Sequence, residues 1–390
     1  MEFTKTYHEL KQNFSITSAD TKLNKRGFTF SSIPFCSNSK PIPYTRTGIY
    51  NETDGYSFAA DDAKIEKNSQ FNLPVYLPNS SSKYNNAIVL LHGLNERSWD
   101  KYLPWAHYLG QKTNRPVILF PLAFHMNRGC DDWSNPRLMM PHLTNRKEDK
   151  DISMATFANI ALSQRLSDDP LRFFTSGNQS ADDLIQLLES INEGSFPFLE
   201  KGAQVDFFSY SIGSFLAQIL FLANPNEIVS HSKLFIFCGG SLFNAMNGTS
   251  RLIMDSHAFR SLRKYYINDF LFEIRTRSPL SSFIKGGVWG ESFIAMINEE
   301  NNQFYREHKL QRLRNQIQII SLKKDAVIPS NAMQSTFACI HNKSKNMITE
   351  LDFPFEYSHE NPFPILSAAK SAEVDKAFNQ VFSKAAAFLC

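Results

Sequence analysis

From residue 87 to the C-terminus, the hydrophobic positions fall into short continuous runs separated by longer stretches with helical spacing. Apolar runs of about four to eight residues are typical of strands buried on both faces of a sheet. Because helical stretches separate the runs, we predict a mostly parallel sheet flanked by helices, an α/β fold. The runs are AIVLL (87–91), PVILF (116–120), VDFF (205–208), KLFIFC (233–238), QIQIISL (316–322) and MITELDF (347–353).

The stretches between these runs predict the helices that cover the sheet. Apolar residues at intervals of three and four mark one face of each, and serine or proline residues mark several ends. The helices that we expect are one after Ser98 carrying Trp99 to Leu109, then Asp151–Leu166, Ala181–Ile191, Ile212–Ala223, Ser330–Ile340 and a last one from Val374 to Ala385.

The N-terminal region has a different character. Residues 1–22 are polar and aperiodic, which predicts a loosely held arm, and two β-type segments, FTFSSIPF and NLPVYL, follow. We assign residues 23–390 to a single domain. Within it, residues 121–177 and 241–315 are too long for simple crossovers. Both leave the carboxyl end of the sheet, so we interpret them as a helical lid or cap.

A serine follows the third of the apolar runs, where a strand should turn sharply into a helix. The chain reads SYSIG from residue 209 to 213. A nucleophile at such a turn needs small residues two positions before and two after it, because strand and helix pass close together. Ser211 meets this requirement, whereas Ser209 and Ser214 have bulky neighbours there. We therefore predict Ser211 as a nucleophile, with an ordinary tight turn as the alternative.

A serine hydroxyl needs a base to take its proton, and the base needs a carboxylate to orient it. On a parallel sheet, the acid is expected after a later strand and the histidine after the acid. Asp325 directly follows QIQIISL, and only His341 and His359 lie beyond it. His341 falls near the end of a predicted helix, which favours a solvated position. We predict His359, in a loop after the last strand, as the general base and Asp325 as its partner.

The tetrahedral intermediate of such a reaction needs two preorganised N–H donors. One is expected from Ile212, at the head of its helix. The other should come from the turn HGLN after AIVLL, where Gly93 permits a tight turn. Leu94 is the expected donor, with Asn95 as the alternative. We interpret His92 as structural, its side chain held between the strand and the loop.

The segments LLHGLNERSW, SYSIGS, KKDAVIP and SHENPF together resemble the α/β-hydrolase superfamily, and LHGLNERSWDKYLPWA and FPLAFHMNR are similar to an uncharacterised bacterial branch of it. The resemblance covers about residues 85–390 apart from the insertions. It implies an α/β-hydrolase-type sheet and the roles given above to the serine, the histidine, the aspartate and the two amides. Ser209 departs from the family pattern, because glycine is usual at that position.

Composition and charge exclude several classes of protein. The 41 basic and 38 acidic residues leave a net charge of +3, without the clustered basic excess of a nucleic-acid binder. The uncharged window from Phe207 to Asn226 contains serines, a glycine and a proline, which favours a buried strand, turn and helix over a membrane span. The N-terminus lacks an apolar signal segment, and five scattered cysteines form no CxxC pair. We expect a cytoplasmic protein with no nucleic-acid partner.

The two insertions carry most of the information about a substrate. The second has aromatic helical stretches, and such stretches belong more often to a core than to a pocket. If they instead form an apolar cap over the serine, they favour an acyl or aromatic ester as the substrate. The first carries polar residues that either bind a polar head group or form a solvated, salt-bridged loop, and we favour the loop. Their spacing does not suit a metal site. They are His125, Arg128, Asp131, Asp132, Trp133 and Arg137.

These observations predict a serine hydrolase that cleaves a carboxylic ester or a related acyl bond of a small-molecule substrate through an acyl-enzyme, without a cofactor or metal. An amidase, a peptidase or an acyltransferase would use the same triad, because leaving-group selection lies in the insertions. A hydrolase-fold binding protein without catalysis is a further alternative. The sequence leaves the substrate, the oligomeric state and the motion of the insertions open.

Overall fold

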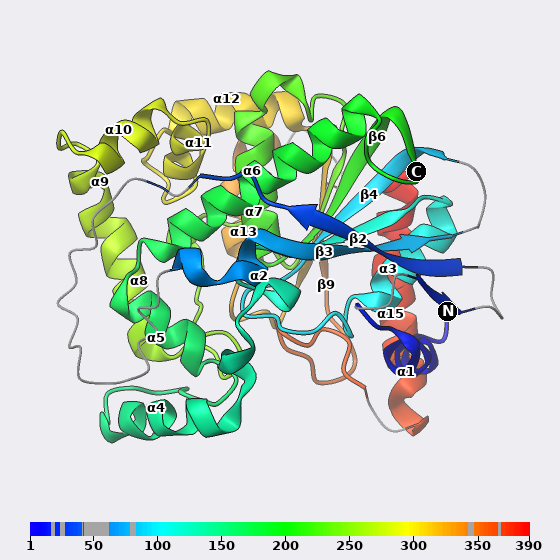
Figure 1. The fold of residues 1–390 in the computed structure, drawn as a ribbon, viewed down its shortest axis with the longest axis horizontal. Helices are drawn as coiled ribbons and strands as arrows, with labels where there is room; N and C mark the ends of the chain where they lie inside the picture. The colour runs from blue at the N-terminus through cyan, green and yellow to red at the C-terminus, as the bar shows by residue number, and fades with distance from the viewer. Residues whose placement is uncertain are drawn as a thin grey trace.

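Nine strands form one sheet in the residues that the computed structural model describes, which are 1–16, 20–23, 28–40, 42, 62–78, 83–341, 347–365 and 368–390. The strand order is β1-β2-β3-β5-β4-β6-β7-β8-β9 (Figure 1). The strands are β1 (Asp20–Leu23), β2 (Phe28–Cys36), β3 (Gln70–Leu77), β4 (Tyr84–Leu91), β5 (Val117–Phe120), β6 (Leu199–Tyr210), β7 (Leu234–Phe237), β8 (Ile317–Leu322) and β9 (Ile348–Leu351).

The strands from β5 across to β9 pair in parallel, and β1, β2 and β3 add an antiparallel edge. Each of the six apolar runs forms one of the parallel strands, and FTFSSIPF and NLPVYL form β2 and β3. The predicted α/β sheet is therefore confirmed. In its register Leu91 pairs with Ser209, so the turn that follows β4 lies beside the turn that follows β6.

Helices cover both faces of the sheet, which explains the continuous apolar runs. One layer contains α1 (Phe3–Asn13), α3 (Leu103–Thr113) and α15 (Ala368–Leu389), and the other is built on α6 (Arg172–Glu193) and α7 (Ile212–Ala223) (Figure 1). Alternate residues of β4 enter opposite cores, because side chains along a strand alternate between faces. Val89 packs in the core on the α6 and α7 side, whereas Leu90 packs in the core on the α3 and α15 side.

The remaining helices lie mostly in the two predicted insertions. Residues 121–177 contain α4, α5 and the first six residues of α6, and residues 241–315 contain α8 to α12. The further helices are α2 (Glu66–Ser69), α4 (Pro136–Glu148), α5 (Ile160–Asp168), α8 (Ser256–Lys264), α9 (Phe270–Glu273), α10 (Pro279–Gly286), α11 (Gly290–Ala295), α12 (Gln303–Leu313), α13 (Ser330–Thr336) and α14 (Ala338–His341).

Four helix starts differ from the sequence prediction. The helix expected from Ala181 begins at Arg172, and the one expected from Val374 begins at Ala368. The helix expected from residue 151 begins at Ile160. The helix expected after Ser98 begins at Leu103. Pro104 suits its first turn, because backbone N–H groups there have no acceptor within the helix and proline lacks that N–H. The Ser98 hydroxyl instead accepts a hydrogen bond from the Asp100 amide at 3.2 Å, within a tight turn.

The layer of α1, α3 and α15 buries much of the aromatic content of the chain, which includes 34 phenylalanines. The ring centroids of Phe378 and Phe382 lie 4.3 Å apart, and that of Phe3 lies 4.5 Å from Phe378. Trp105 packs against Phe382 at 5.3 Å and is fully buried. Stacked and tilted rings thus fill this side of the sheet.

The prediction of a loosely held arm over residues 1–22 is wrong for Phe3–Asn13, because these residues form α1, which packs on the core. Residues 17–19 lie outside the described residues. Phe3, Thr6 and Leu10 are buried and follow helical spacing, a stripe too short to stand out in a polar segment. The Thr4 amide also donates to the Asp375 carboxylate at 3.2 Å, which ties α1 to α15.

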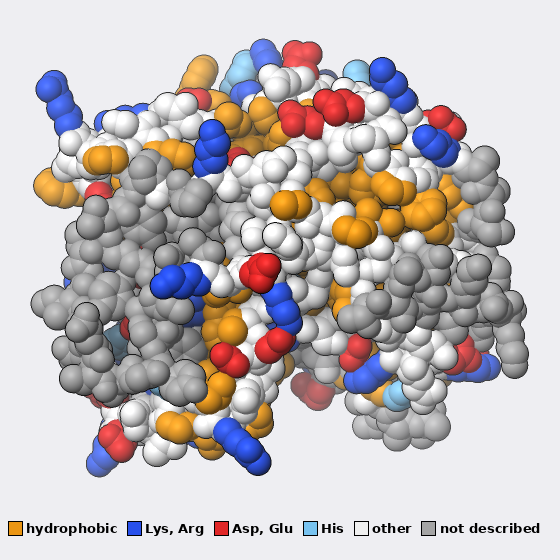
Figure 2. All heavy atoms as spheres, viewed as in Figure 1, with side chains coloured by type: hydrophobic (Ala, Val, Ile, Leu, Met, Phe, Trp, Pro, Cys, Tyr) orange, Lys and Arg blue, Asp and Glu red, His pale blue; other side chains and the backbone are white. Residues whose placement is uncertain are grey.

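The surface carries charges of both signs. On the face shown in Figure 2, Lys and Arg side chains alternate with Asp and Glu side chains, in keeping with the small net charge. Among the described residues, no helix is both long enough and apolar enough to span a bilayer.

Candidate active site

Ser211 lies at the sharp turn between β6 and α7 and is 5% exposed. Its backbone has φ 56° and ψ −123°, and a positive φ at a residue other than glycine costs on the order of 1–3 kcal/mol. A strained serine between a strand and a helix, at the carboxyl edge of a mostly parallel sheet, is the arrangement of α/β hydrolases. The fold is therefore of the α/β-hydrolase type, as predicted.

Small residues on both sides of Ser211 allow this turn to form. A Cβ atom at Gly213 would lie 2.8 Å from the His92 carbonyl oxygen, so only glycine fits where α7 crosses the end of β4. Ser209 is fully buried, and its hydroxyl donates to the Phe235 carbonyl at 3.2 Å. Serine therefore fills the usual glycine position with its hydroxyl bonded to the neighbouring strand.

The structure brings the three predicted side chains together. The Ser211 Oγ lies 2.6 Å from His359 Nε2, and His359 Nδ1 lies 2.7 Å from Asp325 Oδ2. An ionised carboxylate only accepts hydrogen bonds, so Nδ1 carries the proton and Nε2 is left to accept from the serine hydroxyl. The His359 and Asp325 side chains are both buried. The contacts join residues from three different strand ends.

The Asp325 carboxylate is fixed by the backbone of its own loop. Its Oδ1 accepts hydrogen bonds from the amides of Val327 at 2.9 Å and Ile328 at 2.8 Å, which leaves Oδ2 to face His359. Cys238, at the end of β7, is buried beside it. Burial, reinforced by the Asp325 carboxylate, raises the pKa of the Cys238 thiol well above its usual value, so this neighbour stays uncharged.

The loop that carries His359 is held by residues that the sequence analysis did not identify. The Tyr210 hydroxyl donates to the His359 carbonyl oxygen, and the two rings stack with centroids 5.5 Å apart. The Lys101 ammonium donates to the Glu360 carbonyl at 3.1 Å and pairs with the Glu96 carboxylate. Tyr210 directly precedes Ser211, so one residue links the nucleophile turn to the histidine loop. Its place inside the SYSIG motif gave no signal of that role.

The turn after β4 lies against the nucleophile turn. The Gly213 amide donates to the His92 carbonyl at 3.1 Å, and the Gly93 amide donates to the Tyr102 hydroxyl at 2.9 Å. No described residue accepts a hydrogen bond from the amide of Leu94 or of Ile212. Leu94 also lines the cleft that contains Ser211 and His359. Two backbone donors thus remain available beside the serine.

The structural role predicted for His92 is confirmed. Its Nδ1–H donates to the Gly93 carbonyl at 2.8 Å, and its Nε2 accepts from the Leu122 amide at 2.9 Å. Burial lowers the pKa of His92 well below its usual value, so the ring is neutral and both nitrogens are used. His92 therefore joins the turn after β4 to the segment after β5.

The two insertions meet above the cleft and are tied to each other. The Asn95 side-chain amide donates to the carbonyls of Ala158 at 2.8 Å and Leu252 at 2.7 Å, one from each insertion. The Asn159 side-chain amide donates to the Ser250 carbonyl at 2.9 Å, and the Ser250 hydroxyl donates to the Glu360 carboxylate. The cleft beneath them has a volume of about 420 Å³. Residues of both insertions therefore line the cleft.

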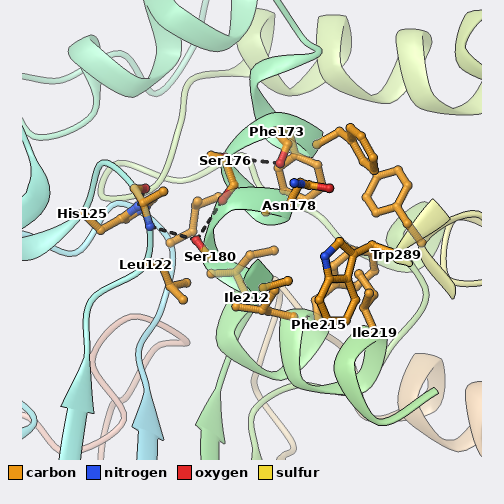
Figure 3. A pocket seen from close by; sticks show the side chains of 17 residues that line it. Leu122, His125, Phe173, Ser176, Asn178, Ser180, Ile212, Phe215, Ile219 and Trp289 are labelled. Carbon is orange, nitrogen blue, oxygen red and sulfur yellow. Dashed lines mark hydrogen bonds between the residues drawn. The ribbon is translucent and has the colours of Figure 1, made fainter. Parts of the chain in front are cut away.

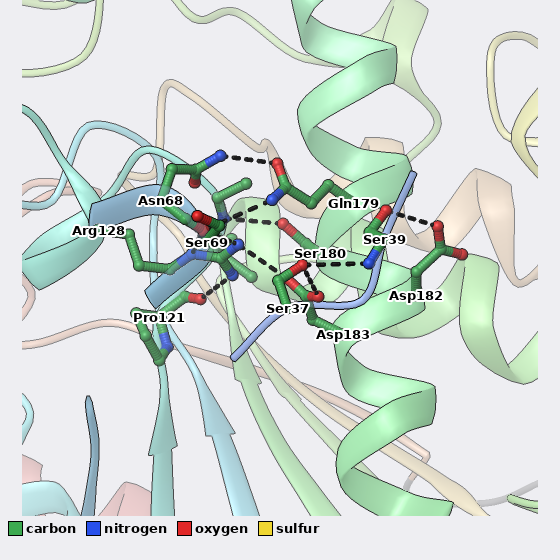
Figure 4. Close-up of polar contacts among 12 residues, drawn as sticks. Ser37, Ser39, Asn68, Ser69, Pro121, Arg128, Gln179, Ser180, Asp182 and Asp183 are labelled. Atoms are coloured by element: carbon green, nitrogen blue, oxygen red, sulfur yellow. Dashed lines mark hydrogen bonds and ion pairs between the residues drawn. The ribbon is translucent and has the colours of Figure 1, made fainter. Parts of the chain in front are cut away.

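Part of the polar cluster in the first insertion is buried, contrary to the solvated loop that we favoured. Arg128 is fully buried and donates to the Asp183 carboxylate at 2.7 Å and to the Asn68 and Pro121 carbonyls (Figure 4). Burial lowers the pKa of Arg128 to about 10, although Asp183 opposes that shift. Asp131, by contrast, forms an exposed pair with Lys67, as a salt-bridged loop would. The buried part anchors the segment after β5 to α6.

The described residues contain no group of three or more His, Cys, Asp or Glu side chains placed to hold a metal ion. The close contacts at this site are instead those of a hydroxyl, an imidazole and a carboxylate.

Comparison with known proteins places the chain in a family. One similar solved structure is carboxyl esterase 2 from the mycorrhizal fungus Tuber melanosporum, with 10% sequence identity and a TM-score of 0.45, covering 99% of this chain and 97% of that one. Another is a bacterial heroin esterase, with 9% identity and a TM-score of 0.47, covering 100% of this chain and 90% of that one. A hyperthermophilic esterase from the archaeon Pyrobaculum calidifontis is also similar, with 12% identity and a TM-score of 0.40, covering 98% of this chain and 90% of that one. No curated protein matches the chain. A family model matches residues 1–390, and the chain belongs to that family, which is described as a family of unknown function (DUF6051).

Proposed function

We propose that this protein is a serine hydrolase that cleaves a carboxylic ester, or a related acyl bond, through an acyl-enzyme. The observation that carries this proposal is the chain of short contacts from Ser211 to His359 to Asp325, at 2.6 Å and 2.7 Å. A nucleophile within hydrogen-bond reach of a base, with the base oriented by a third group, is the signature of covalent acyl transfer.

In the first half-reaction, the Ser211 oxygen attacks the acyl carbon while its proton passes to His359 Nε2. Asp325 stabilises the imidazolium that forms and keeps its ring in place. The amides of Leu94 and Ile212 receive the oxyanion of the tetrahedral intermediate. The imidazolium then protonates the leaving alkoxide, the bond from the acyl carbon to that oxygen breaks, and the acyl group stays on the serine.

In the second half-reaction, a water molecule replaces the departed alcohol. His359 takes a proton from the water as its oxygen attacks the acyl carbon, and the same two amides hold the new oxyanion. The proton then returns to the Ser211 oxygen as the acyl bond breaks, which releases the carboxylic acid. The buried positions of Ser211 and His359 support this course, because electrostatic interactions strengthen where water is excluded.

The experiment is hydrolysis of short-chain p-nitrophenyl esters by the wild type and by the Ser211→Ala variant. Loss of a triad serine is expected to lower kcat by roughly 10⁶-fold. Ser214→Ala is the matched control, because Ser214 is three residues away on α7 and its buried hydroxyl has no partner among the described residues. Equal rates for the wild type and Ser211→Ala would refute the nucleophile assignment, and faster cleavage of matched amides would favour the amidase alternative.

A further inference from the structure

A cavity of about 60 Å³ lies between α6 and α7. Leu94 and Ile212, the residues whose amides the proposed mechanism uses, both line it, so we infer that it lies close to the carbonyl oxygen of a bound acyl group. Its walls are mostly apolar side chains, drawn in Figure 3 from the two helices, the segment after β5 and the second insertion. They include Leu122, Phe173, Phe215, Ile219, Trp289 and Phe293.

The polar groups around this cavity are already paired or neutral. The Ser176 hydroxyl donates to the Arg172 carbonyl at 2.6 Å, and the Trp289 indole N–H donates to Asp182 at 2.7 Å. The Ser180 hydroxyl donates to the Ser176 carbonyl at 2.8 Å, a hydrogen bond drawn as a dashed line in Figure 3. Burial lowers the pKa of His125 to about 4, which keeps that ring uncharged. The cavity therefore suits an apolar group better than a charged one.

Gly177 gives a second, independent indication that this space is kept open. It lies inside α6, where glycine destabilises a helix relative to alanine. A Cβ atom at Gly177 would meet no other atom within 4 Å, so packing does not require glycine. Because Gly177 lines the cavity, any side chain there would occupy part of it.

The position of the cavity relative to the triad distinguishes the two halves of an ester. The leaving oxygen must lie beside His359, which protonates it, and His359 lines the cleft rather than this cavity. The acyl substituent projects from the same carbon in another direction. The cavity beyond Leu94 and Ile212 is the apolar space that remains for it.

We propose that this cavity binds the acyl group of the substrate and that its size selects short acyl chains. The proposal rests on the proposed hydrolase function and names its substrate class, esters of short aliphatic acids. An apolar cavity of about 150 Å³ holds benzene, so by the same ratio 60 Å³ holds about two to three carbon atoms. Propionyl and butyryl groups fit that volume, whereas octanoyl and benzoyl groups do not.

The test compares two ester series. One varies the acyl chain from acetyl to decanoyl on p-nitrophenol, and the other varies the alcohol of a butyrate ester. The wild type should reach its highest kcat/KM at propionate or butyrate. Gly177→Leu should lower the butyrate-to-acetate ratio of kcat/KM by about tenfold or more, since each methylene in an apolar pocket counts. Phe215→Ala should move the optimum to longer chains, and neither variant should change the relative kcat/KM values within the alcohol series.

Gly286→Leu is the matched control, because Gly286 is exposed at the end of α10, and a Cβ there also meets nothing within 4 Å. It should leave both series unchanged. An optimum at decanoate, or a Gly177→Leu profile identical to that of the wild type, would overturn the cavity assignment while Ser211-dependent hydrolysis still stood. Absence of hydrolysis of every ester, with no labelling of Ser211 by a p-nitrophenyl methylphosphonate, would overturn the hydrolase and the cavity together.

Discussion

The two faces of the sheet bury their side chains in different ways. On the α1, α3 and α15 side, aromatic rings stack at centroid distances such as 4.3 Å between Phe378 and Phe382. On the α6 and α7 side, the core contains a cavity, an internal helix glycine and a buried ion pair between Arg128 and Asp183. Rings also pack on the α6 and α7 side, where the centroids of Phe174 and Phe293 lie 4.8 Å apart, so the cavity rather than the presence of rings distinguishes the two faces. We therefore expect substitutions in the α1, α3 and α15 layer to affect stability alone, and we expect the proposed acyl group to bind on the α6 and α7 side.

After Ser211→Ala, the largest effect on activity is expected at the rim of the sheet, from Asp325→Asn. An asparagine amide in place of the carboxylate would favour the wrong tautomer of His359, so kcat should fall by roughly 10⁴-fold. Steady-state hydrolysis of a short ester measures this, and thermal unfolding should show a folded protein. Asp352→Asn, at a more exposed carboxylate, is the control and should keep its rate. Full activity in Asp325→Asn would mean that the carboxylate has no role.

The largest effect on stability is expected on the aromatic side, from Phe382→Ala. This ring is fully buried and packs against Phe208, Phe378 and Trp105. Its loss should lower the free energy of unfolding by about 3–5 kcal/mol, while kcat/KM of the folded fraction stays unchanged. Denaturant unfolding measures the first quantity. Phe304→Ala, at a ring that is 86% exposed, should change neither. A loss of activity without loss of stability in Phe382→Ala would break the division between the two faces.

A smaller, pH-dependent effect is expected on the cavity side from His125. Its pKa of about 4 in the folded protein lies below the ordinary value near 6.5, so the unfolded chain binds a proton first as the pH falls. The free energy of unfolding should therefore decrease as the pH falls from 6.5 to 4, by at most about 3 kcal/mol from this residue.

Unfolding titrations across that pH window test this expectation. His125→Gln should flatten the dependence, although His92, which burial also keeps neutral, leaves part of it in place. His231→Gln, at an exposed histidine, should keep the wild-type slope. An identical slope in His125→Gln would show that His125 is not buried as a neutral ring.

The parallel strands could be predicted from the sequence, because continuous apolar runs are local signals. Ser211, Asp325 and His359 could be selected as candidates, because each follows a predicted strand in the chain. The sequence did not indicate α1, since Phe3, Thr6 and Leu10 form too short a stripe to detect in a polar segment. It also missed Tyr210 as a link to the His359 loop, because that contact joins residues 149 positions apart. The cavity beside Gly177 was equally hidden, since the empty space depends on how the two insertions pack over α6 and α7.

The proposed function rests on Ser211 acting as a nucleophile, and the most direct measurement is the site of covalent labelling. The folded wild type is treated with a small p-nitrophenyl methylphosphonate, from which p-nitrophenolate leaves as the serine oxygen bonds to phosphorus. Peptide mass spectrometry locates the adduct, with Asp325→Asn and Ser214→Ala treated in parallel. We predict a single adduct on Ser211, formed much more slowly in Asp325→Asn and at the wild-type rate in Ser214→Ala. A folded protein that remains unlabelled, or an adduct on a different serine, would contradict this prediction.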